Sequence, residues 1–211
     1  MFYKAFKRFY DFVLALLGLV ILSPIFLILM ILIKLDSKGP ILFKQRRVGK
    51  NKKLFNILKF RTMRIDTPKD TPTHLLENPE QWITKMGKFL RKTSLDELPQ
   101  IINILKGDMS IIGPRPALWN QEDLIAERDK YNVHSVLPGL TGYAQISGRD
   151  ALEIPVKAKL DGDYIKKMSL WFDIKIFFGT IRSIIKSEGV VEGGTGAIKK
   201  DSTKPNGVKH E

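Results

Sequence analysis

The sequence predicts an α+β protein that is mostly helical and that combines a membrane-embedded N-terminal helix with a small compact cytosolic domain. Three observations support this: an uncharged apolar run near the N-terminus, short strand and helix patterns after it, and a Gly-rich polar end. With 211 residues, 44% hydrophobic and 27% charged, one principal folded domain is expected. We place the membrane helix at residues 1–35, the main domain at 36–188 and a flexible tail at 189–211.

The composition excludes several kinds of site and indicates the charge of the partner. The chain has no cysteine, which excludes a disulfide framework, a Cys-ligated zinc and a cysteine nucleophile. Its three histidines are too scattered to indicate a His-rich metal site. The net charge of +13 indicates an anionic partner, and nucleic acid, lipid headgroups and phosphorylated substrates all remain open.

The apolar run extends over 22 residues, Phe12–Ile33, without a charge. As a helix it would be roughly 33 Å long at ~1.5 Å per residue, enough to cross a ~30 Å hydrocarbon core. The apolar stretch of a signal peptide is usually shorter, and the core helix of a small protein is rarely apolar on every face. We therefore expect this segment to lie in the membrane.

Ser23-Pro24 interrupts the middle of this run, where proline removes a backbone donor. Basic residues flank both ends of the run, whereas a crossing helix usually has most of its positive charge on one side. This pattern is what a re-entrant helix–break–helix that returns to the same leaflet would show, and a kinked spanning helix fits the residues equally well. The flanking basic residues, which we expect to contact anionic headgroups, are Lys4, Lys7, Arg8, Lys34, Lys38, Lys44, Arg46 and Arg47.

Within the main domain we predict a strand at 41–43, a basic turn at 45–53 and a second strand at 54–60. Residues 66–80 are predicted to form an irregular loop because they contain three prolines. Helices are predicted at 83–90, 98–105 and 171–186. The last helix is expected to pack through one apolar stripe, formed by Trp171, Ile174, Phe178, Ile181 and Ile185.

Asp96 and Glu97 are the first candidate site. Ser94 and Glu97 have the spacing of a capping box, but Pro99 would then occupy a helical position that needs a backbone N–H. A helix that starts between Asp96 and Leu98 and stops near Gly107 avoids this conflict and leaves both carboxylates at its positive end. A helix N-terminus also attracts phosphate, and carboxylates and phosphate repel each other unless a cation lies between them. The functional interpretation is therefore a bridging Mg²⁺, and the alternative is plain helix capping.

Two further segments contain polar groups that suit a phosphate ligand. Gly113-Pro-Arg115-Pro116 forms a rigid turn that can hold a guanidinium in place, unless it is an ordinary proline-rich turn. Residues 137–149 offer glycines together with Gln145 and Arg149, which suits a loop around a nucleotide, although the spacing is not that of a P-loop.

Together these segments resemble the bacterial sugar transferases, and more narrowly the small monotopic phosphoglycosyl transferases that begin glycan assembly on a polyprenol carrier. The resemblance covers residues 1 to about 188, so that 36–188 would be the catalytic domain. The motifs that carry it are Ser23-Pro24, Lys59-Phe-Arg-Thr-Met63, Ser94-Leu-Asp-Glu-Leu-Pro-Gln100, Lys106-Gly-Asp-Met-Ser-Ile-Ile-Gly-Pro-Arg-Pro116 and Pro138-Gly-Leu-Thr-Gly142.

The resemblance implies transfer of a sugar 1-phosphate from a UDP-sugar to undecaprenyl phosphate, with release of UMP. Asp96 would attack the sugar-bearing phosphate and form a covalent intermediate, and the carrier phosphate would then attack in a ping-pong sequence. Glu97 would serve as metal partner or proton acceptor, and Asp96 and Glu97 together would bind Mg²⁺. The cations and polar groups expected to bind the phosphates are Lys59, Arg91 and Arg115, followed by Arg61, Gln145 and Arg149.

The same resemblance places the protein at the cytoplasmic face of the bacterial inner membrane, among phospholipids, and leaves room for a homodimer. Its product would serve capsule, O-antigen, exopolysaccharide or glycoprotein assembly. Direct attack by the lipid phosphate, without a covalent enzyme intermediate, is the mechanistic alternative. The non-enzymatic alternative is a basic membrane-tethered module for nucleic acid or lipid. We expect no nucleic-acid partner, because no basic patch interleaved with aromatic residues is evident.

Overall fold

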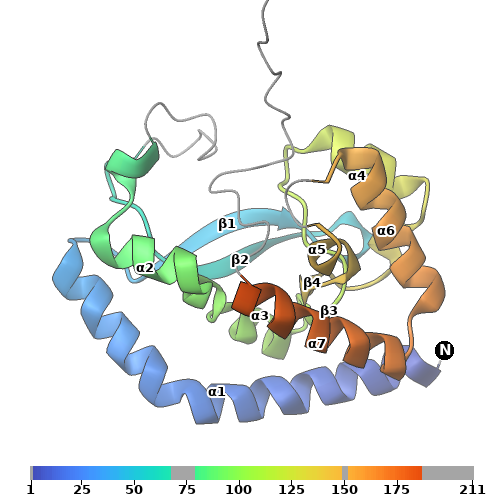
Figure 1. Ribbon diagram of the computed structural model, residues 1–211, viewed down its shortest axis with the longest axis horizontal. Helices are drawn as coiled ribbons and strands as arrows, with labels where there is room; N and C mark the ends of the chain where they lie inside the picture. The colour runs from blue at the N-terminus through green and yellow to red at the C-terminus, as the bar shows by residue number, and fades with distance from the viewer. Residues whose placement is uncertain (1, 68–78, 149–151, 187–211) are drawn as a thin grey trace, which may run out of the picture.

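The computed structural model describes residues 2–67, 79–148 and 152–186. It confirms a mostly helical protein: helices surround two small sheets, and one long N-terminal helix runs along the body (Figure 1). The predicted loop at 66–80 lies largely outside the described residues, and the predicted tail at 189–211 lies wholly outside them.

The N-terminal helix α1 (Phe2–Asp36) is one continuous helix of 35 residues with Pro24 inside it. The expectation of two helices separated by a break at Ser23-Pro24 is therefore wrong, although α1 changes direction part way along (Figure 1). Proline lacks the N–H that would bond to the carbonyl of Val20, and the Ser23 hydroxyl donates to that carbonyl at 2.7 Å. The helix can bend here because a side chain replaces the missing donor.

One face of α1 packs against the body, which lies on its concave side, and its opposite face carries exposed apolar side chains (Figure 1). By length and composition Tyr3–Asp36 could cross a membrane, and 17% of its most apolar window is buried. The buried apolar residues of this helix are Ala15, Phe26, Leu29 and Ile33. Most of the apolar surface of α1 is thus left for a partner outside the body.

An antiparallel hairpin follows, made of β1 (Leu42–Val48) and β2 (Leu54–Phe60). The first strand is longer than the predicted 41–43, and the predicted basic turn at 45–53 is shorter, because residues 44–48 pair with β2. The Val48 N–H also donates to the Ala117 carbonyl at 3.0 Å. Arg47, expected at lipid headgroups, donates instead to the Pro116 carbonyl at 3.0 Å.

A buried amide joins this hairpin to the helix that follows the carboxylate pair. The Asn103 side chain accepts from the Leu58 N–H at 2.9 Å and donates to the Asn56 carbonyl at 2.9 Å. Asn103 belongs to α3 (Gln100–Lys106), so its two bonds hold that helix against β2.

The predicted acidic segment forms the 3-10 turn η4 (Leu95–Glu97), which lies between α2 (Lys85–Thr93) and α3 in the chain. Ser94 ends α2 in the left-handed region (φ 56°) and makes no side-chain capping bond, so the capping box is not formed. Pro99 is the N-cap of α3, whose first residue is Gln100, and Gly107 (φ 91°) ends it. The predicted stop near Gly107 is confirmed, but the predicted start between Asp96 and Leu98 is wrong, because Leu95–Glu97 form the separate 3-10 turn η4.

The second sheet pairs β3 (Ser110–Ile112) with β4 (Gly139–Thr141) in parallel. A Cβ on Gly142 would lie 2.0 Å from the Gly113 carbonyl oxygen, and one on Gly139 would lie 2.1 Å from the Gly113 nitrogen. These two glycines therefore let two backbones touch, which is a packing reason for a pattern that suggested a nucleotide loop.

The remaining helices are η1 (Lys50–Lys52), η3 (Pro79–Trp82), α4 (Glu122–Asp129), η5 (Val133–Ser135), α5 (Tyr143–Ile146), α6 (Ile154–Lys167) and α7 (Leu170–Lys186). Of these, η1 lies in the turn between β1 and β2, η3 lies near α2, and the others lie around the second sheet (Figure 1).

The predicted apolar stripe of α7 does not pack against the body. Trp171 is 80% exposed and Phe178 is 63% exposed, while Asp173 and Ile176 on the other face are buried. Asp173 decides the orientation, because its carboxylate accepts hydrogen bonds from four side chains, those of Tyr3, Lys7, Tyr10 and Tyr164. Ile174 and Ile181 are exposed as well, and the side chain of Ile185 is not described.

Candidate active site

Asp96 and Glu97 lie on η4, where two cations reach them from separate elements. Glu97 Oε1 accepts from Lys59 Nζ on β2 at 2.8 Å and from Arg115 Nη2 at 2.6 Å, and Oε2 accepts from Arg115 Nη1 at 3.3 Å. Asp96 Oδ2 lies 3.9 Å from the same Lys59 Nζ. The fold thus brings four of the predicted site residues into one cluster.

The two neighbouring carboxyl groups titrate differently because their partners differ. Burial raises the pKa of Asp96, and this outweighs the attraction of Lys59, while the negative charge of Glu97 raises it further. Burial acts on Glu97 in the same direction, but the charges and hydrogen bonds of Arg115 and Lys59 outweigh it and hold the pKa of Glu97 well below its usual range. Glu97 is consequently a fixed anion, and Asp96 is the less constrained of the two carboxylates.

Arg91, on α2, is a third cation at this cluster. Its Nε donates to the Thr62 hydroxyl at 3.0 Å, which orients the guanidinium. Its positive charge lowers the pKa of Asp96, against the effect of burial. Arg91 therefore acts electrostatically on Asp96.

Arg61 does not join the cluster. Its guanidinium donates to the carbonyls of Lys38 and of Ser37, the latter at 2.8 Å, and so ties the end of β2 to the segment that follows α1. The residue is 6% exposed, and both of these partners are backbone groups that need a donor. The expectation that Arg61 contacts a phosphate is corrected to a structural role.

The other weaker candidates are not placed at the carboxylates by any described contact. Gln145 Nε2 folds back onto the Leu140 carbonyl at 3.1 Å, and its Oε1 is buried with no hydrogen-bond partner among the described residues. Arg149 lies outside the described residues.

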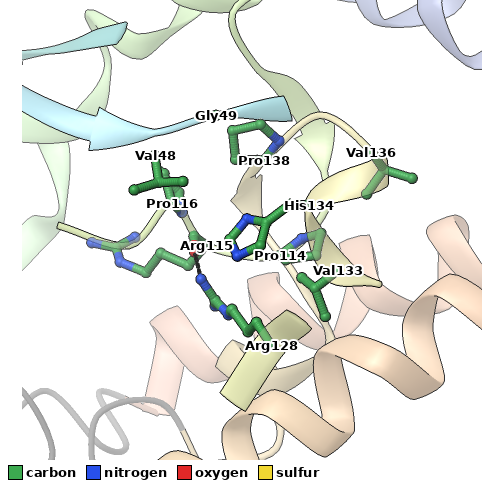
Figure 2. A pocket seen from close by; sticks show the side chains of 10 residues that line it. All are labelled: Val48, Gly49, Pro114, Arg115, Pro116, Arg128, Val133, His134, Val136 and Pro138. Atoms are coloured by element: carbon green, nitrogen blue, oxygen red, sulfur yellow. Dashed lines mark hydrogen bonds between the residues drawn. The ribbon is translucent and has the colours of Figure 1, made fainter. Parts of the chain in front are cut away.

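The turn Gly113–Pro116 positions Arg115, and its backbone is bonded on several sides. The Gly113 N–H donates to Thr141 at 2.8 Å, and the Pro114 carbonyl accepts from the Gly139 N–H at 2.9 Å. Arg128 Nη1 donates to the carbonyl of Arg115 itself at 2.9 Å (Figure 2). The rigid turn expected from the prolines is therefore fixed also by tertiary hydrogen bonds.

Arg128 is a residue that sequence reasoning missed. It lies on α4, and its Nε and Nη2 donate to Asp161 Oδ2 on α6 at 2.9 and 2.5 Å. Neither residue stands in a recognisable motif, and 33 positions separate them, so no local signal connects them.

The donor set fits a magnesium ion that a substrate completes. Among the described residues no group of three or more His, Asp or Glu side chains could form a complete protein cage. Magnesium in phosphate-transfer sites commonly takes one or two carboxylates and fills its other positions with water and phosphate oxygens. Asp96 suits this role, since its Oδ2 lies 3.9 Å from Lys59 Nζ, beyond hydrogen-bond distance.

The comparisons with known proteins identify the family of this chain. The profile of the family described as "Bacterial sugar transferase" matches residues 2–187, and the chain belongs to this family. A relative from Escherichia coli (strain K12), named UDP-glucose:undecaprenyl-phosphate glucose-1-phosphate transferase, is 43% identical over 83% of this chain and 39% of its own length. One from Aeromonas hydrophila, named UDP-N-acetylgalactosamine-undecaprenyl-phosphate N-acetylgalactosaminephosphotransferase, is 39% identical over 89% of this chain and 45% of its own.

The chain spans less than half the length of these two relatives. It spans far more of a relative from Bacillus subtilis (strain 168), named Uncharacterized sugar transferase EpsL, which is 41% identical over 87% of this chain and 89% of that protein.

Proposed function

We propose that this protein transfers a sugar 1-phosphate from a UDP-sugar to undecaprenyl phosphate and releases UMP, as an initiating step of bacterial surface glycan assembly. The observation that carries the proposal is the unequal pairing of two adjacent carboxylates: Glu97 accepts hydrogen bonds from Lys59 and Arg115, while Asp96 lies 3.9 Å from Lys59. The names of two relatives, each a UDP-sugar and undecaprenyl-phosphate phosphotransferase, support the substrate class.

In the proposed reaction Asp96 acts as the nucleophile. One of its oxygens bonds to the sugar-linked phosphorus, while the bond from that phosphorus to the bridging oxygen breaks and UMP leaves with the electron pair. An oxygen of the carrier phosphate then attacks the same phosphorus and releases the Asp96 carboxylate. Ionised Asp96 is required, and the nearby charges of Lys59 and Arg91 favour that form.

Glu97 holds Lys59 and Arg115 in position before substrate arrives. Preplaced charges stabilise the phosphoryl oxygens in the transition state without reorganising during the reaction. Both cations are partly accessible, with side chains 18% and 37% exposed, so incoming phosphate oxygens can reach them. Mg²⁺ held by Asp96 and Glu97 would neutralise charge between the carboxylates and the diphosphate.

We further propose that both ends of α1 lie on the cytoplasmic side of the membrane. Near its N-terminus, Arg8 donates to the carbonyls of Ile104 and Leu105 at 2.6 and 3.0 Å, and Asp11 accepts from the Ser110 hydroxyl at 2.7 Å. At its other end Asp36 accepts from the Met86 N–H at 3.1 Å. Because one polar body binds both ends, a helix that carried its N-terminus across the bilayer would break these bonds.

The exposed stripe of α7 supports the same membrane placement. Asp173 bonds α7 to the N-terminal part of α1, so two helices with exposed apolar side chains lie next to each other at one edge of the body (Figure 1). A helix with one apolar face and a tryptophan suits the bilayer interface. We propose that α7 rests on the phospholipid surface beside α1.

The chemical proposal is tested by incubating the protein with a UDP-sugar and Mg²⁺, without lipid acceptor, and measuring its intact mass. We expect a gain of one sugar phosphate that maps to Asp96 and is absent from Asp96→Asn. Asp96 lies within η4 and caps no helix, and Asn keeps the shape of its side chain, so a purely structural Asp96 predicts an active variant, which would refute the covalent mechanism. UMP release that occurs only when lipid phosphate is present, with no adduct, would support direct attack.

The topology is tested by labelling a single cysteine in a tag ahead of α1, since the chain has none of its own. We expect no labelling from the periplasmic side in intact cells. Labelling there would show that α1 spans the membrane.

A further inference from the structure

Outside the carboxylate cluster, the most deeply buried ion pair of the described chain joins Arg128 on α4 to Asp161 on α6. Their side chains are 3% and 1% exposed. Burying two charges costs several kcal/mol of desolvation, and a well-packed apolar pair of similar size is often at least as stable. A pair in this place therefore calls for a reason beyond stability.

We propose that Arg128 is a positioning residue for the reaction, acting through the backbone of Arg115, with Asp161 holding Arg128 in place. The proposal rests on the proposed function, because it assigns a role in phosphate binding to Arg115. Arg128 uses one side of its guanidinium for Asp161 and its remaining Nη1 for the Arg115 carbonyl at 2.9 Å (Figure 2).

The need for this bond follows from what happens to Arg115 when substrate binds. The Arg115 side chain is 37% exposed, and it is oriented by its two bonds to Glu97. A phosphate that recruits Arg115 must weaken those bonds. The position of the guanidinium then depends on its backbone, where the carbonyl of the same residue is bonded to Arg128.

Arginine meets both partners through separate nitrogens. Its planar fork binds Asp161 through Nε and Nη2 and leaves Nη1 directed at the Arg115 carbonyl. Lysine would keep the charge but offer one nitrogen to two acceptors. His134 lines the same pocket (Figure 2), where burial and the charge of Arg128 lower its pKa, so at neutral pH it adds no competing positive charge.

The experiment is a double-mutant cycle on UMP release with Arg128→Lys, Arg115→Lys and the double variant, in the full-length protein. If Arg128 acts through Arg115, Arg128→Lys lowers kcat about tenfold and leaves the KM for UDP-sugar within about twofold, and the double variant is no slower than Arg115→Lys alone. Effects that multiply would overturn the proposal, as would full activity of Arg128→Lys.

A matched control uses a second buried ion pair, Lys7–Asp173, in which Nζ and Oδ2 are 2.6 Å apart. This pair joins α1 to α7 and includes neither carboxylate of the candidate site. The effects of Asp173→Asn and Arg115→Lys on the rate of UMP release should multiply, because the two side chains share no partner that would couple them. If Arg128→Lys does not fold, Asp161→Asn takes its place in the cycle, since it retains the shape of the carboxylate and removes only its charge.

A readout independent of turnover separates this proposal from the proposed function. Arg128→Lys should speed amide hydrogen exchange in a peptide covering residues 110–118, while a peptide covering residues 86–95 keeps its native rate. If native protein releases no UMP but this exchange pattern appears, the proposed function fails and the positioning of the turn stands. Unchanged exchange at 110–118 would overturn the positioning role.

Discussion

Replacing the two adjacent carboxylates should change the stability of the protein in opposite directions. Glu97→Gln keeps the side-chain shape but leaves Lys59, 18% exposed, and Arg115, 37% exposed, without their anion. Breaking a fully buried ion pair costs roughly 3–5 kcal/mol. Because water can solvate Arg115, we expect a loss of about 2–3 kcal/mol, which at ~2–4 °C per kcal/mol lowers the Tm by about 4–12 °C.

Asp96→Asn should instead raise the Tm at pH 7. The folded-state pKa of Asp96 is above its unfolded value because of burial, so the ionised group opposes folding at any pH above both values. Asparagine carries no charge to desolvate. For Glu97 the sign is reversed: its folded-state pKa is depressed, so its stabilisation is complete above the unfolded value of 4.5 and is lost as the pH falls further. The Tm difference between Glu97→Gln and native protein should therefore shrink below that pH.

The measurement is thermal unfolding followed by tryptophan fluorescence in nanodiscs at pH 7 and at a series of lower pH values. Asp66→Asn is the control, since it removes an ion pair with Arg64 whose side chains are both more than half exposed, and its Tm should match the native value. The reasoning is refuted if Glu97→Gln is as stable as native protein, or if Asp96→Asn is destabilised as much as Glu97→Gln.

Three other outcomes follow from the same structure. Chelation by EDTA should stop UMP release and added Mg²⁺ should restore it; an undiminished rate in EDTA would contradict a metal at Asp96 and Glu97. In variants with a single tryptophan, acyl-brominated phospholipids should quench the fluorescence of Trp171, which is 80% exposed on α7. They should not quench Trp119, which is 55% exposed ahead of α4. Equal Trp171 emission with and without bromine would place α7 off the bilayer. Arg61→Ala should lower the Tm, because two backbone carbonyls lose their donor, while the KM for UDP-sugar stays native; a raised KM would return Arg61 to the substrate site.

Local chemistry predicted much of the fold. The end of α3 at Gly107 follows from a left-handed conformation that glycine adopts readily, whereas its start, predicted between Asp96 and Leu98, lies at Gln100, just after Pro99. The carboxylate pair and the rigid Arg115 turn were likewise identified from residue types and spacing. Their meeting with Lys59 was expected only from the resemblance, because the three segments are separated in sequence and the fold brings them together.

Lys59 and Arg61 show where residue type stops being informative. Both are basic and two positions apart, yet Lys59 pairs with Glu97 while Arg61 lies beyond the end of β2 and caps carbonyls that follow α1. The difference arises because η4 lies beside Lys59, whereas the segment that follows α1 lies beside Arg61.

Helical periodicity has the same limit on α7. The spacing shows which residues share a face, and Trp171 and Phe178 do, but it does not show which face is buried. Asp173 decides that, through partners on α1 more than 160 positions away. Residue types and spacing predicted the helix that ends at Gly107, the last helix and the charged groups of the candidate site, whereas β3, β4, α4, α5 and α6 were not predicted. Tertiary structure decided which charges meet and which apolar face stays exposed, because a buried polar group must find its partners wherever the fold places them.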